Sequence, residues 1–220
     1  MLELQNVSFS FEGTQLLQTL SHSYAEGKTT AITGPPGCGK SVLLKLSAGL
    51  LLPSQGRVLF RGQDIAQMRP SQNMAFRKAS AVIFQNSALW ANQSIYQNLE
   101  LPLKQHYPDQ SPTERNYRIQ EVLEEVGYQR PLNIRPAALS MGEQKLVAFA
   151  RALLCSPRLL FLDEWTESLN DKAARKLLSI VEGMKAKNST IIFVSHDQSI
   201  VASLADHTLF LECGTLCKKG

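Results

Sequence analysis

The sequence predicts an α/β protein with a small antiparallel sheet near its N-terminus and a helical segment inserted into its middle. Short apolar runs that end in polar residues, at 159–162 and 190–194, are typical of buried strands. Residues 86–136 show little strand pattern and instead contain helix-start signals. With 220 residues, the chain is long enough for one α/β domain of ordinary size that carries an inserted subdomain.

The first two strands are predicted to pair as a hairpin. Residues 2–11 alternate between apolar and polar side chains, 12–14 supply a turn, and 15–24 form a second run. Phe11 lies at the tip of this hairpin. Its ring either packs on the edge of the sheet or offers a platform for a stacked base, and spacing alone favours packing.

A phosphate-binding loop is predicted between a strand at 30–32 and a helix. The pattern G-x-x-x-x-G-K-[ST] is filled by Gly34, Pro35, Pro36, Gly37, Cys38, Gly39, Lys40 and Ser41. Glycines let consecutive backbone N–H groups turn inward around an anion. The Lys40 ammonium can reach the β- and γ-phosphates of a nucleotide, and the Ser41 hydroxyl can ligate magnesium. Apolar residues at helical spacing follow, as the motif requires.

Polar residues stand at the carboxyl ends of three predicted strands. Gln85 follows the run 81–84, Asp163 and Glu164 follow 159–162, and His196 follows 190–194. Ligands of α/β proteins bind at this edge of the sheet, where an aspartate serves magnesium and a second carboxylate orients water. The alternatives are an ordinary strand-terminal glutamine and a structural histidine, but the shared edge favours a functional role for His196.

Two capping boxes predict helix starts. Ser111 with Glu114 opens a helix whose apolar stripe closes at Gly127, and Ser140 with Glu143 opens the next one. Between Gln85 and the first of these helices lies an apolar group that comprises Trp90, Tyr96 and Leu101. Such a group is more often local core than a groove for a partner.

Composition excludes several classes of protein. The net charge is +4, from 23 basic and 19 acidic residues without basic blocks, which argues against nucleic-acid wrapping. No apolar run is long enough to span a bilayer, and the N-terminal residues lack the layout of a signal peptide. The four scattered cysteines favour free thiols in a reducing compartment over a metal site.

In order and spacing, these motifs resemble the ATP-binding subunit of ABC transporters over essentially the whole chain. The resemblance implies a P-loop NTPase (RecA-like) core with an antiparallel β subdomain and an inserted α-helical subdomain. The core would comprise 1–85 and 157–220, and the helical subdomain with the signature motif would comprise 86–156. It also implies ATP and Mg²⁺ as ligands and hydrolysis of ATP as the activity.

The resemblance also assigns roles to residues. Phe11 matches the adenine-stacking aromatic, against the packing favoured by its spacing. Residues 34–41 match the Walker A loop, and Val42 directly after it is a further nucleotide-binding position. Catalytic roles fall to Lys40, Gln85, Glu164 and His196, and the metal ligands would be Ser41, Gln85 and Asp163. The signature segment comprises Ser140, Met141, Gly142 and Glu143, which in the family contact the nucleotide held by the opposing subunit.

Several positions depart from the family pattern. Val42 replaces a threonine that commonly contacts the α-phosphate, and the signature reads LSMGE where LSGGQ is common. The Glu143 carboxylate would repel a phosphate unless it folds back onto Ser140 in the capping box. Trp165 stands where a proline is usual and Asn170 where an aspartate is usual. These changes concern subunit coupling and turnover more than nucleotide binding.

As implied by the resemblance, the active species is a dimer of two copies bound to transmembrane permease subunits, with a substrate- or lipid-binding component as a further partner. The chain would lie in the cytoplasm on the inner face of the cytoplasmic membrane. Residues 84–90 and 94–103 resemble ATPases of the Mla and Mce class, which move lipids between bacterial membranes. The alternatives are another transporter type, a soluble ABC ATPase acting on DNA or ribosomes, and a weakly hydrolysing regulatory protein.

Overall fold

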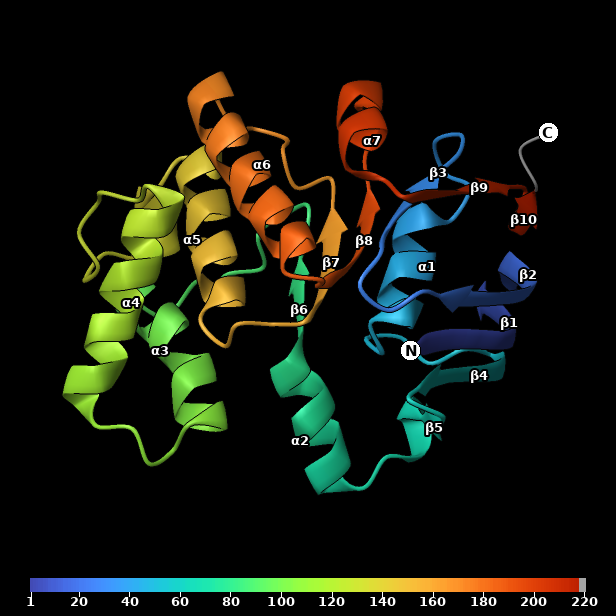
Figure 1. Cartoon of the computed structure of the whole chain (residues 1–220), viewed down its shortest axis with the longest axis horizontal. Coiled ribbons are helices and arrows are strands. Elements are labelled where there is room, and N and C mark those ends of the chain that lie inside the picture. The colour runs from blue at the N-terminus through green and yellow to red at the C-terminus, as the bar shows by residue number, and fades with distance from the viewer. Residues whose placement is uncertain (218–220) are drawn as a thin grey trace.

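A mostly parallel sheet runs through the centre of the protein (Figure 1). The structure is a computed structural model and describes residues 1–217. Within these residues, neighbouring strands of this sheet are parallel except at one edge, where β10 pairs antiparallel with β9. In spatial order the strands are β10 (Thr215–Cys217), β9 (His207–Glu212), β3 (Thr29–Thr33), β8 (Thr190–Val194), β7 (Leu159–Asp163) and β6 (Ser80–Ile83).

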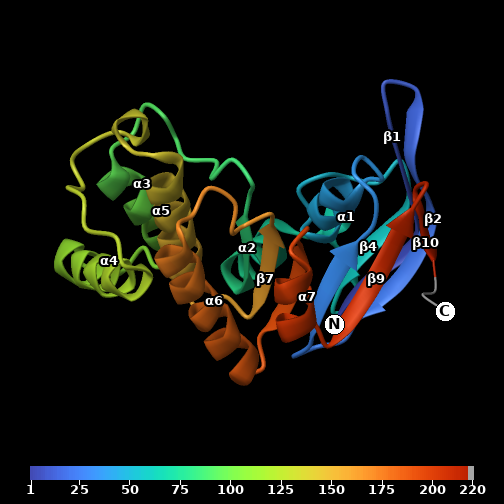
Figure 2. The same ribbon diagram turned by 90° about the horizontal axis from the view of Figure 1, so that it is seen from above.

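A second, antiparallel sheet contains the predicted N-terminal hairpin. Phe11 pairs with Thr14 at its tip, and Leu2 pairs with Tyr24 at its base. Figure 2 shows this hairpin extending from the strand-rich end of the molecule. In spatial order the strands are β2 (Thr14–Tyr24), β1 (Leu2–Phe11), β4 (Gln55–Phe60) and β5 (Gln63–Asp64).

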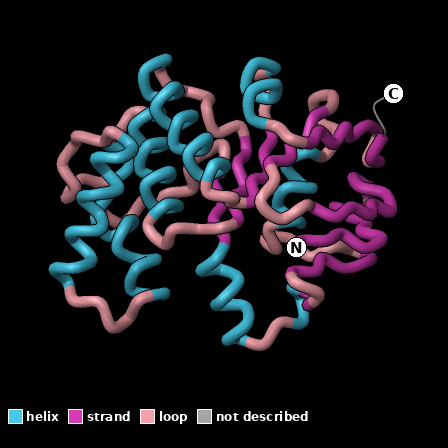
Figure 3. Tube along the Cα trace, viewed as in Figure 1, coloured by secondary structure: helices cyan, strands magenta, loops and turns pink. Residues whose placement is uncertain are grey.

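Helices α3, α4 and α5 gather at the opposite end of the molecule from the antiparallel sheet (Figure 3). None of the described helices is long and apolar enough to cross a membrane. The α-helices are α1 (Lys40–Ser47), α2 (Pro70–Ala79), α3 (Ile95–His106), α4 (Pro112–Val126), α5 (Met141–Leu153), α6 (Asp171–Ala186) and α7 (Gln198–Leu204), with 3₁₀ turns at Ile65–Gln67 and Pro136–Ala138. The predicted α/β fold with an antiparallel sheet and a helical insertion is confirmed.

Two apolar cores hold these layers together. In one, α1 packs between the two sheets through Leu43 and Leu46, which meet Leu4 of β1 and Ile192 of β8. In the other, α5 and α6 contribute apolar side chains against the opposite face of the parallel sheet, and α3 and α4 pack on α5. The helix that carries the phosphate loop is therefore fixed from both sides by burial of its apolar stripe.

The predicted helix boundaries at Ser111 and Gly127 are confirmed. The Ser111 hydroxyl accepts a hydrogen bond from the Glu114 N–H at 3.2 Å, and the Glu114 carboxylate accepts one from the Ser111 N–H at 2.7 Å. Gly127 ends the helix with φ of 80°, a conformation that glycine adopts without strain. Local capping chemistry thus determines both ends of α4.

The prediction of a local core around Trp90 and Leu101 is wrong. Trp90 is 55% exposed and Leu101 is 42% exposed, whereas Tyr96 is half-buried against the helical core. Helix α3 buries a different face, made by Ile95, Leu99 and Leu103. Because these three residues repeat every four positions, Leu101 lies on the other side of the helix.

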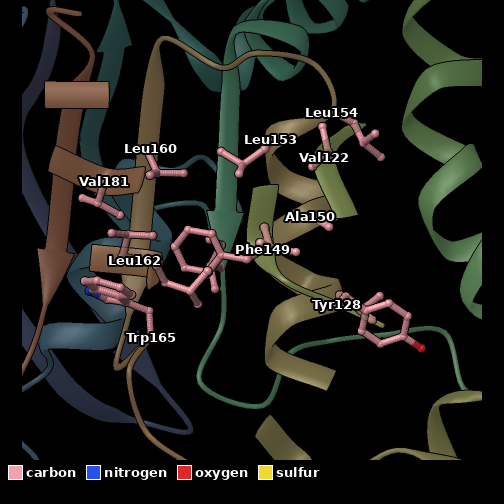
Figure 4. Packing of buried hydrophobic residues seen from close by; sticks show 14 of the residues in the cluster. Val122, Tyr128, Phe149, Ala150, Leu153, Leu154, Leu160, Leu162, Trp165 and Val181 are labelled. Atoms are coloured by element: carbon pink, nitrogen blue, oxygen red, sulfur yellow. The ribbon is translucent and has the colours of Figure 1, made fainter. Parts of the chain in front are cut away.

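Trp165 is fully buried, although it occupies the turn after Glu164. Its ring lies beside Leu162 and Phe149 in Figure 4, and the centroids of the Trp165 and Phe149 rings are 5.6 Å apart. The indole therefore links the segment after β7 directly to α5. Sequence patterns did not predict this contact because it joins residues far apart in the chain.

Replacing this indole should destabilise the whole domain. We expect Trp165→Ala to lower the free energy of unfolding by about 3–5 kcal/mol, because a buried aromatic ring leaves a cavity. Urea denaturation measures the change. The matched control is Trp90→Ala, which removes an exposed indole and should stay within about 0.5 kcal/mol of the parent. Equal losses in the two variants would contradict the packing role of Trp165.

Candidate active site

The carboxyl ends of the parallel strands open onto a cleft of about 320 Å³. Its walls include the phosphate loop, the first turn of α1 and the residues that follow β6, β7 and β8. The predicted site residues that line it are Pro36, Gly37, Gly39, Lys40, Ser41, Val42, Gln85, Glu164 and His196. The topology therefore brings segments that are far apart in the chain to one edge of the sheet, as expected for a ligand site in this fold class.

The backbone of the loop requires glycine at two positions. Gly34 has φ of 147°, and a Cβ atom there would lie 2.0 Å from the Leu211 carbonyl oxygen. Gly39 has φ of 100° directly before α1, and a Cβ atom there would lie 2.9 Å from a Leu17 methyl group. Because neither position accepts a side chain without a shift, the loop can curl tightly against the helix N-terminus, a favourable arrangement for an anion.

Lys40 is almost completely buried inside this loop. Its Nζ donates hydrogen bonds to the carbonyl oxygens of Gly34 at 3.0 Å and Pro35 at 2.8 Å. The ammonium has three N–H groups, so two contacts to the loop leave one for another acceptor. The loop thus holds a positive charge at its centre, as the binding of a phosphate requires.

Ser41 and Asp163 meet across the cleft. The Ser41 hydroxyl donates a hydrogen bond of 2.9 Å to Asp163 Oδ1, and the Asp163 side chain is 4% exposed at the end of β7. A hydroxyl oxygen beside a carboxylate oxygen matches the hard oxygen ligands that Mg²⁺ prefers. The residues present therefore fit this ion.

Gln85 is oriented by a residue that the sequence reasoning missed. Its Nε2 donates a 2.9 Å hydrogen bond to Glu167 Oε2. A carboxylate only accepts hydrogen bonds, so the amide N–H₂ must face Glu167 and the amide oxygen remains for a metal ion or water. The position of Glu167, three residues after Glu164, was the only sequence signal for this contact.

Glu164 combines burial with an unpaired oxygen. Its side chain is buried, and Oε1 has no hydrogen-bond partner within residues 1–217, although His196 Nε2 lies 3.2 Å away. Its Oε2 accepts a 3.3 Å hydrogen bond from the His196 backbone N–H. Burial raises the pKa of Glu164, the adjacent His196 partly lowers it, and Glu167 and Asp163 raise it further. A buried carboxylate with an unused lone pair can accept a proton from water.

The predicted signature residues lie outside the lining of this cleft. Ser140 is the N-cap of α5, and the Glu143 carboxylate accepts hydrogen bonds from the Ser140 N–H at 2.8 Å and the Ser140 hydroxyl at 2.9 Å. These bonds lower the pKa of Glu143, and Arg130 lies 3.7 Å from its other oxygen. The predicted capping box is confirmed. Met141 is 67% exposed, and a Cβ atom at Gly142 would lie 2.8 Å from the Ser168 carbonyl oxygen.

Phe11 also lies outside the cleft lining, at the tip of the N-terminal hairpin. Its ring is 60% exposed, so the packing that its spacing favoured is wrong. An exposed aromatic face at this position remains available for stacking.

Comparison with known proteins identifies this constellation of residues. The family profile described as ABC transporter matches residues 17–167, which include the phosphate loop, Gln85, the segment Ser140–Glu143 and Glu164. The chain belongs to the ABC transporter family. It is therefore an ATP-binding subunit of an ABC transporter with a P-loop NTPase fold and ATPase activity, as the sequence predicted.

Individual ABC transporter proteins resemble the chain over most of its length. It is 33% identical to the intermembrane phospholipid transport system ATP-binding protein of Haemophilus influenzae, over 96% of this chain and 80% of that protein. It is 31% identical to a methionine import ATP-binding protein of Clostridium acetobutylicum, over 100% of this chain and 68% of that protein. A dimeric ATP-binding cassette in a post-hydrolysis state with ADP and Pi superposes with a TM-score of 0.91 at 26% identity, covering 100% and 98% of the two chains.

The raised pKa of Glu164 predicts a pH-dependent stability difference. The Glu164 carboxyl binds its proton more tightly in the folded state than in the unfolded state. The stabilisation that this proton gives the folded state is therefore fully present below the ordinary pKa of 4.5 and is lost as pH rises through the pKa of the folded state. In Glu164→Gln, the side chain carries no charge at any pH. Without nucleotide, this variant should melt at a higher temperature than the parent at pH 8, with the gain vanishing near pH 4.5.

Thermal unfolding across this pH range measures the effect. Glu125→Gln makes the same substitution at an exposed site on α4 and gives the baseline. A constant difference between Glu164→Gln and the parent at all pH values would contradict the raised pKa.

Proposed function

We propose that two copies of this chain close around two molecules of Mg-ATP and that their hydrolysis drives transport through a separate membrane permease. The observation that carries this proposal is the division of the site residues. Lys40, Ser41, Asp163 and Glu164 lie together at one sheet edge, whereas the Ser140–Glu143 segment lies apart from their cleft and faces outward through Met141. One chain therefore supplies the two halves of two different sites.

Within its own cleft, the chain supplies the groups that in-line phosphoryl transfer to water needs. The backbone N–H groups of the loop, which Pro35 and Pro36 lack, and the Lys40 ammonium hold the β- and γ-phosphates. Glu164 accepts the proton of the attacking water at the unpaired Oε1, and His196 and Gln85 orient that water and the γ-phosphate. Phe11 stacks on the adenine.

Magnesium would be held by Ser41 and Asp163, with the Gln85 amide oxygen next to it, and would supply neutralisation of phosphate charge. Glu167 serves this arrangement because it fixes which end of the Gln85 amide faces the cleft. Val42 has no hydroxyl, so one contact to the α-phosphate is lost. The residues that would hold magnesium are not affected by this change.

The partner copy would complete the site with Ser140, Met141, Gly142 and Glu143. The N-terminus of α5 lies in this segment, and its free N–H groups suit a γ-phosphate. The Glu143 carboxylate is held back by Ser140 and faces Arg130, which reduces its repulsion of phosphate. Support for a dimer comes from the solved cassette that resembles this chain and is itself dimeric.

The chain would divide into a core of 1–85 and 157–220 and a helical subdomain of 86–156. Helices α3, α4 and α5 pack on one another, which supports treating them as one subdomain, while α5 also packs on β6 and α4 on α6. This unit would carry the signature segment toward and away from the nucleotide of the partner.

A groove on α3 is the proposed contact with the permease. It has a volume of about 190 Å³ and is lined by Trp90, Gln93, Gln97, Leu101 and Lys104, among others. Trp90 and Leu101, both exposed, are the apolar residues of its otherwise polar lining, and it lies just beyond Gln85 in the chain. Docking here would place the chain on the cytoplasmic face of the membrane and connect the permease to the hydrolytic site.

Lipid is the proposed class of cargo. It is supported by the similarity to an intermembrane phospholipid transport protein and by the residues 84–103 that resemble the Mla and Mce class. The similar identity to a methionine import protein makes a small solute the competing cargo. Isolating the complex and identifying what its permease and any binding component retain separates the two.

Glu164→Gln should nearly abolish turnover while nucleotide binding persists, because an amide cannot accept the proton of water. Phosphate release measures hydrolysis, and equilibrium binding of ATP measures affinity. With ATP and Mg²⁺ this variant should accumulate as a dimer by size-exclusion chromatography. An unchanged rate of ATP hydrolysis would show that Glu164 is not the proton acceptor. A variant that stays monomeric at saturating ATP would contradict nucleotide sites shared between two copies.

Leu101→Glu should reduce recovery of the chain with detergent-solubilised membrane proteins, because a carboxylate in place of an apolar residue of the groove opposes docking. The control is Tyr117→Glu, which places the same charge on an exposed ring of α4 outside the groove. Immunoblotting of the purified complex compares the two. Equal recovery of both variants would show that the permease docks elsewhere.

A further inference from the structure

Lys145 is a buried lysine that the catalytic scheme above leaves unused. It lies on α5, five residues after Ser140, and its side chain is 2% exposed. Within residues 1–217 it forms no ion pair. A buried ammonium is costly unless other groups satisfy it, so its contacts require a function or a strong structural reason.

The Lys145 ammonium holds the backbone at Gln85. Its Nζ donates hydrogen bonds to the Phe84 carbonyl oxygen at 3.0 Å and to the Gln85 carbonyl oxygen. Burial lowers the pKa of Lys145, and the more distant carboxylates of Glu167, Asp163 and Glu164 partly oppose this. The side chain thus joins α5 to the segment that leaves β6 at the cleft.

Gln85 is held at two points that belong to different elements. Its backbone is tied to α5 through Lys145, and its side-chain amide is tied to Glu167 in the segment after β7. Further along, Arg151 of α5 donates hydrogen bonds to the carbonyl oxygens of Ser87 and Ala88. Lys145 therefore acts on the residue that faces the cleft, whereas Arg151 acts on the residues behind it.

We propose that Lys145 is a positioning residue for ATP hydrolysis, which makes Gln85 move together with α5. Since the N-terminus of α5 carries Ser140 and Glu143, this bond connects the cleft of one chain with the segment that serves the nucleotide of its partner. The contacts of Lys145 lie within one chain. The connection to the partner rests on the proposed dimer.

A double-mutant cycle with Gln85 tests this inference. Lys145→Met removes a buried charge at similar side-chain volume, a change that proteins commonly tolerate. It should lower kcat by about 10- to 100-fold, the usual effect of a residue that orients a ligand. The dissociation constant for ATP should change less than about two-fold, because Lys145 touches no part of the phosphate loop.

In a Gln85→Ala background, Lys145→Met should cause no further loss of kcat, because the side chain that it positions is already absent. If the losses multiply instead, Lys145 acts independently of Gln85 and the proposal fails. If Lys145→Met folds poorly, Lys145→Gln retains an amide donor and enters the same cycle. The decrease in kcat that Lys145→Gln causes must likewise vanish in the Gln85→Ala background.

Amide hydrogen exchange gives a readout that does not depend on catalysis. Lys145→Met should increase exchange across residues 84–90 and leave the remainder of α5 unchanged. Lys176→Met is the control, because Lys176 also donates to a backbone oxygen, that of Glu124, at 3.0 Å but far from Gln85 in the fold. Unchanged exchange at 84–90 in Lys145→Met would overturn the proposal.

The same preparations separate this proposal from the proposed function. If Glu164→Gln forms the ATP-bound dimer but the Lys145 cycle is additive, only the proposed role of Lys145 is wrong and the proposed function stands. If no dimer forms yet the cycle is non-additive, Lys145 still positions Gln85 within one chain, and the connection to a partner is wrong.

Discussion

The hydrogen bond between Ser41 and Asp163 is the contact on which the site depends. It joins residues 122 positions apart and spans 2.9 Å between the first turn of α1 and the end of β7. The bond can form only because β3, β8 and β7 are parallel neighbours, so that their carboxyl ends reach the same edge. Gln85, Glu164 and His196 arrive at this edge by the same topology.

Residues whose role depends on local geometry were predictable from the sequence. The phosphate loop and the capping boxes at Ser111 and Ser140 each lie within a few residues, and backbone chemistry alone fixes them. The buried strands followed from their apolar runs. The polar residues at the strand ends could then be placed on one edge because that edge is a property of the topology.

Contacts between distant elements were not predictable in the same way. Nothing in the local pattern shows that Lys145 reaches the backbone of Gln85, that Glu167 accepts from its side chain, or that Trp165 fills the space beside Phe149. The exposure of Trp90 was misjudged for the same reason, since it depends on which face α3 turns to the core. Such contacts are decided by packing across the fold.

The departures from the family pattern lie in several parts of the fold. Val42 lines the nucleotide cleft, Trp165 packs against α5, and Glu143 is tied to the N-cap of that helix. Asn170 caps the start of α6 with a 2.9 Å hydrogen bond from the Ala173 N–H, a bond that an aspartate could equally accept. Two of the departures, Glu143 and Trp165, therefore bear on α5, the helix that begins in the signature segment.

Mixing two inactive variants tests most directly whether each nucleotide site needs two copies of the chain. Lys40→Ala disables the phosphate loop, and Ser140→Arg disables the signature segment. In a mixed dimer, one site carries both lesions and the other carries none. If each site is shared between two copies, the mixture hydrolyses ATP well above either variant alone; a mixture no more active than its components would contradict shared sites.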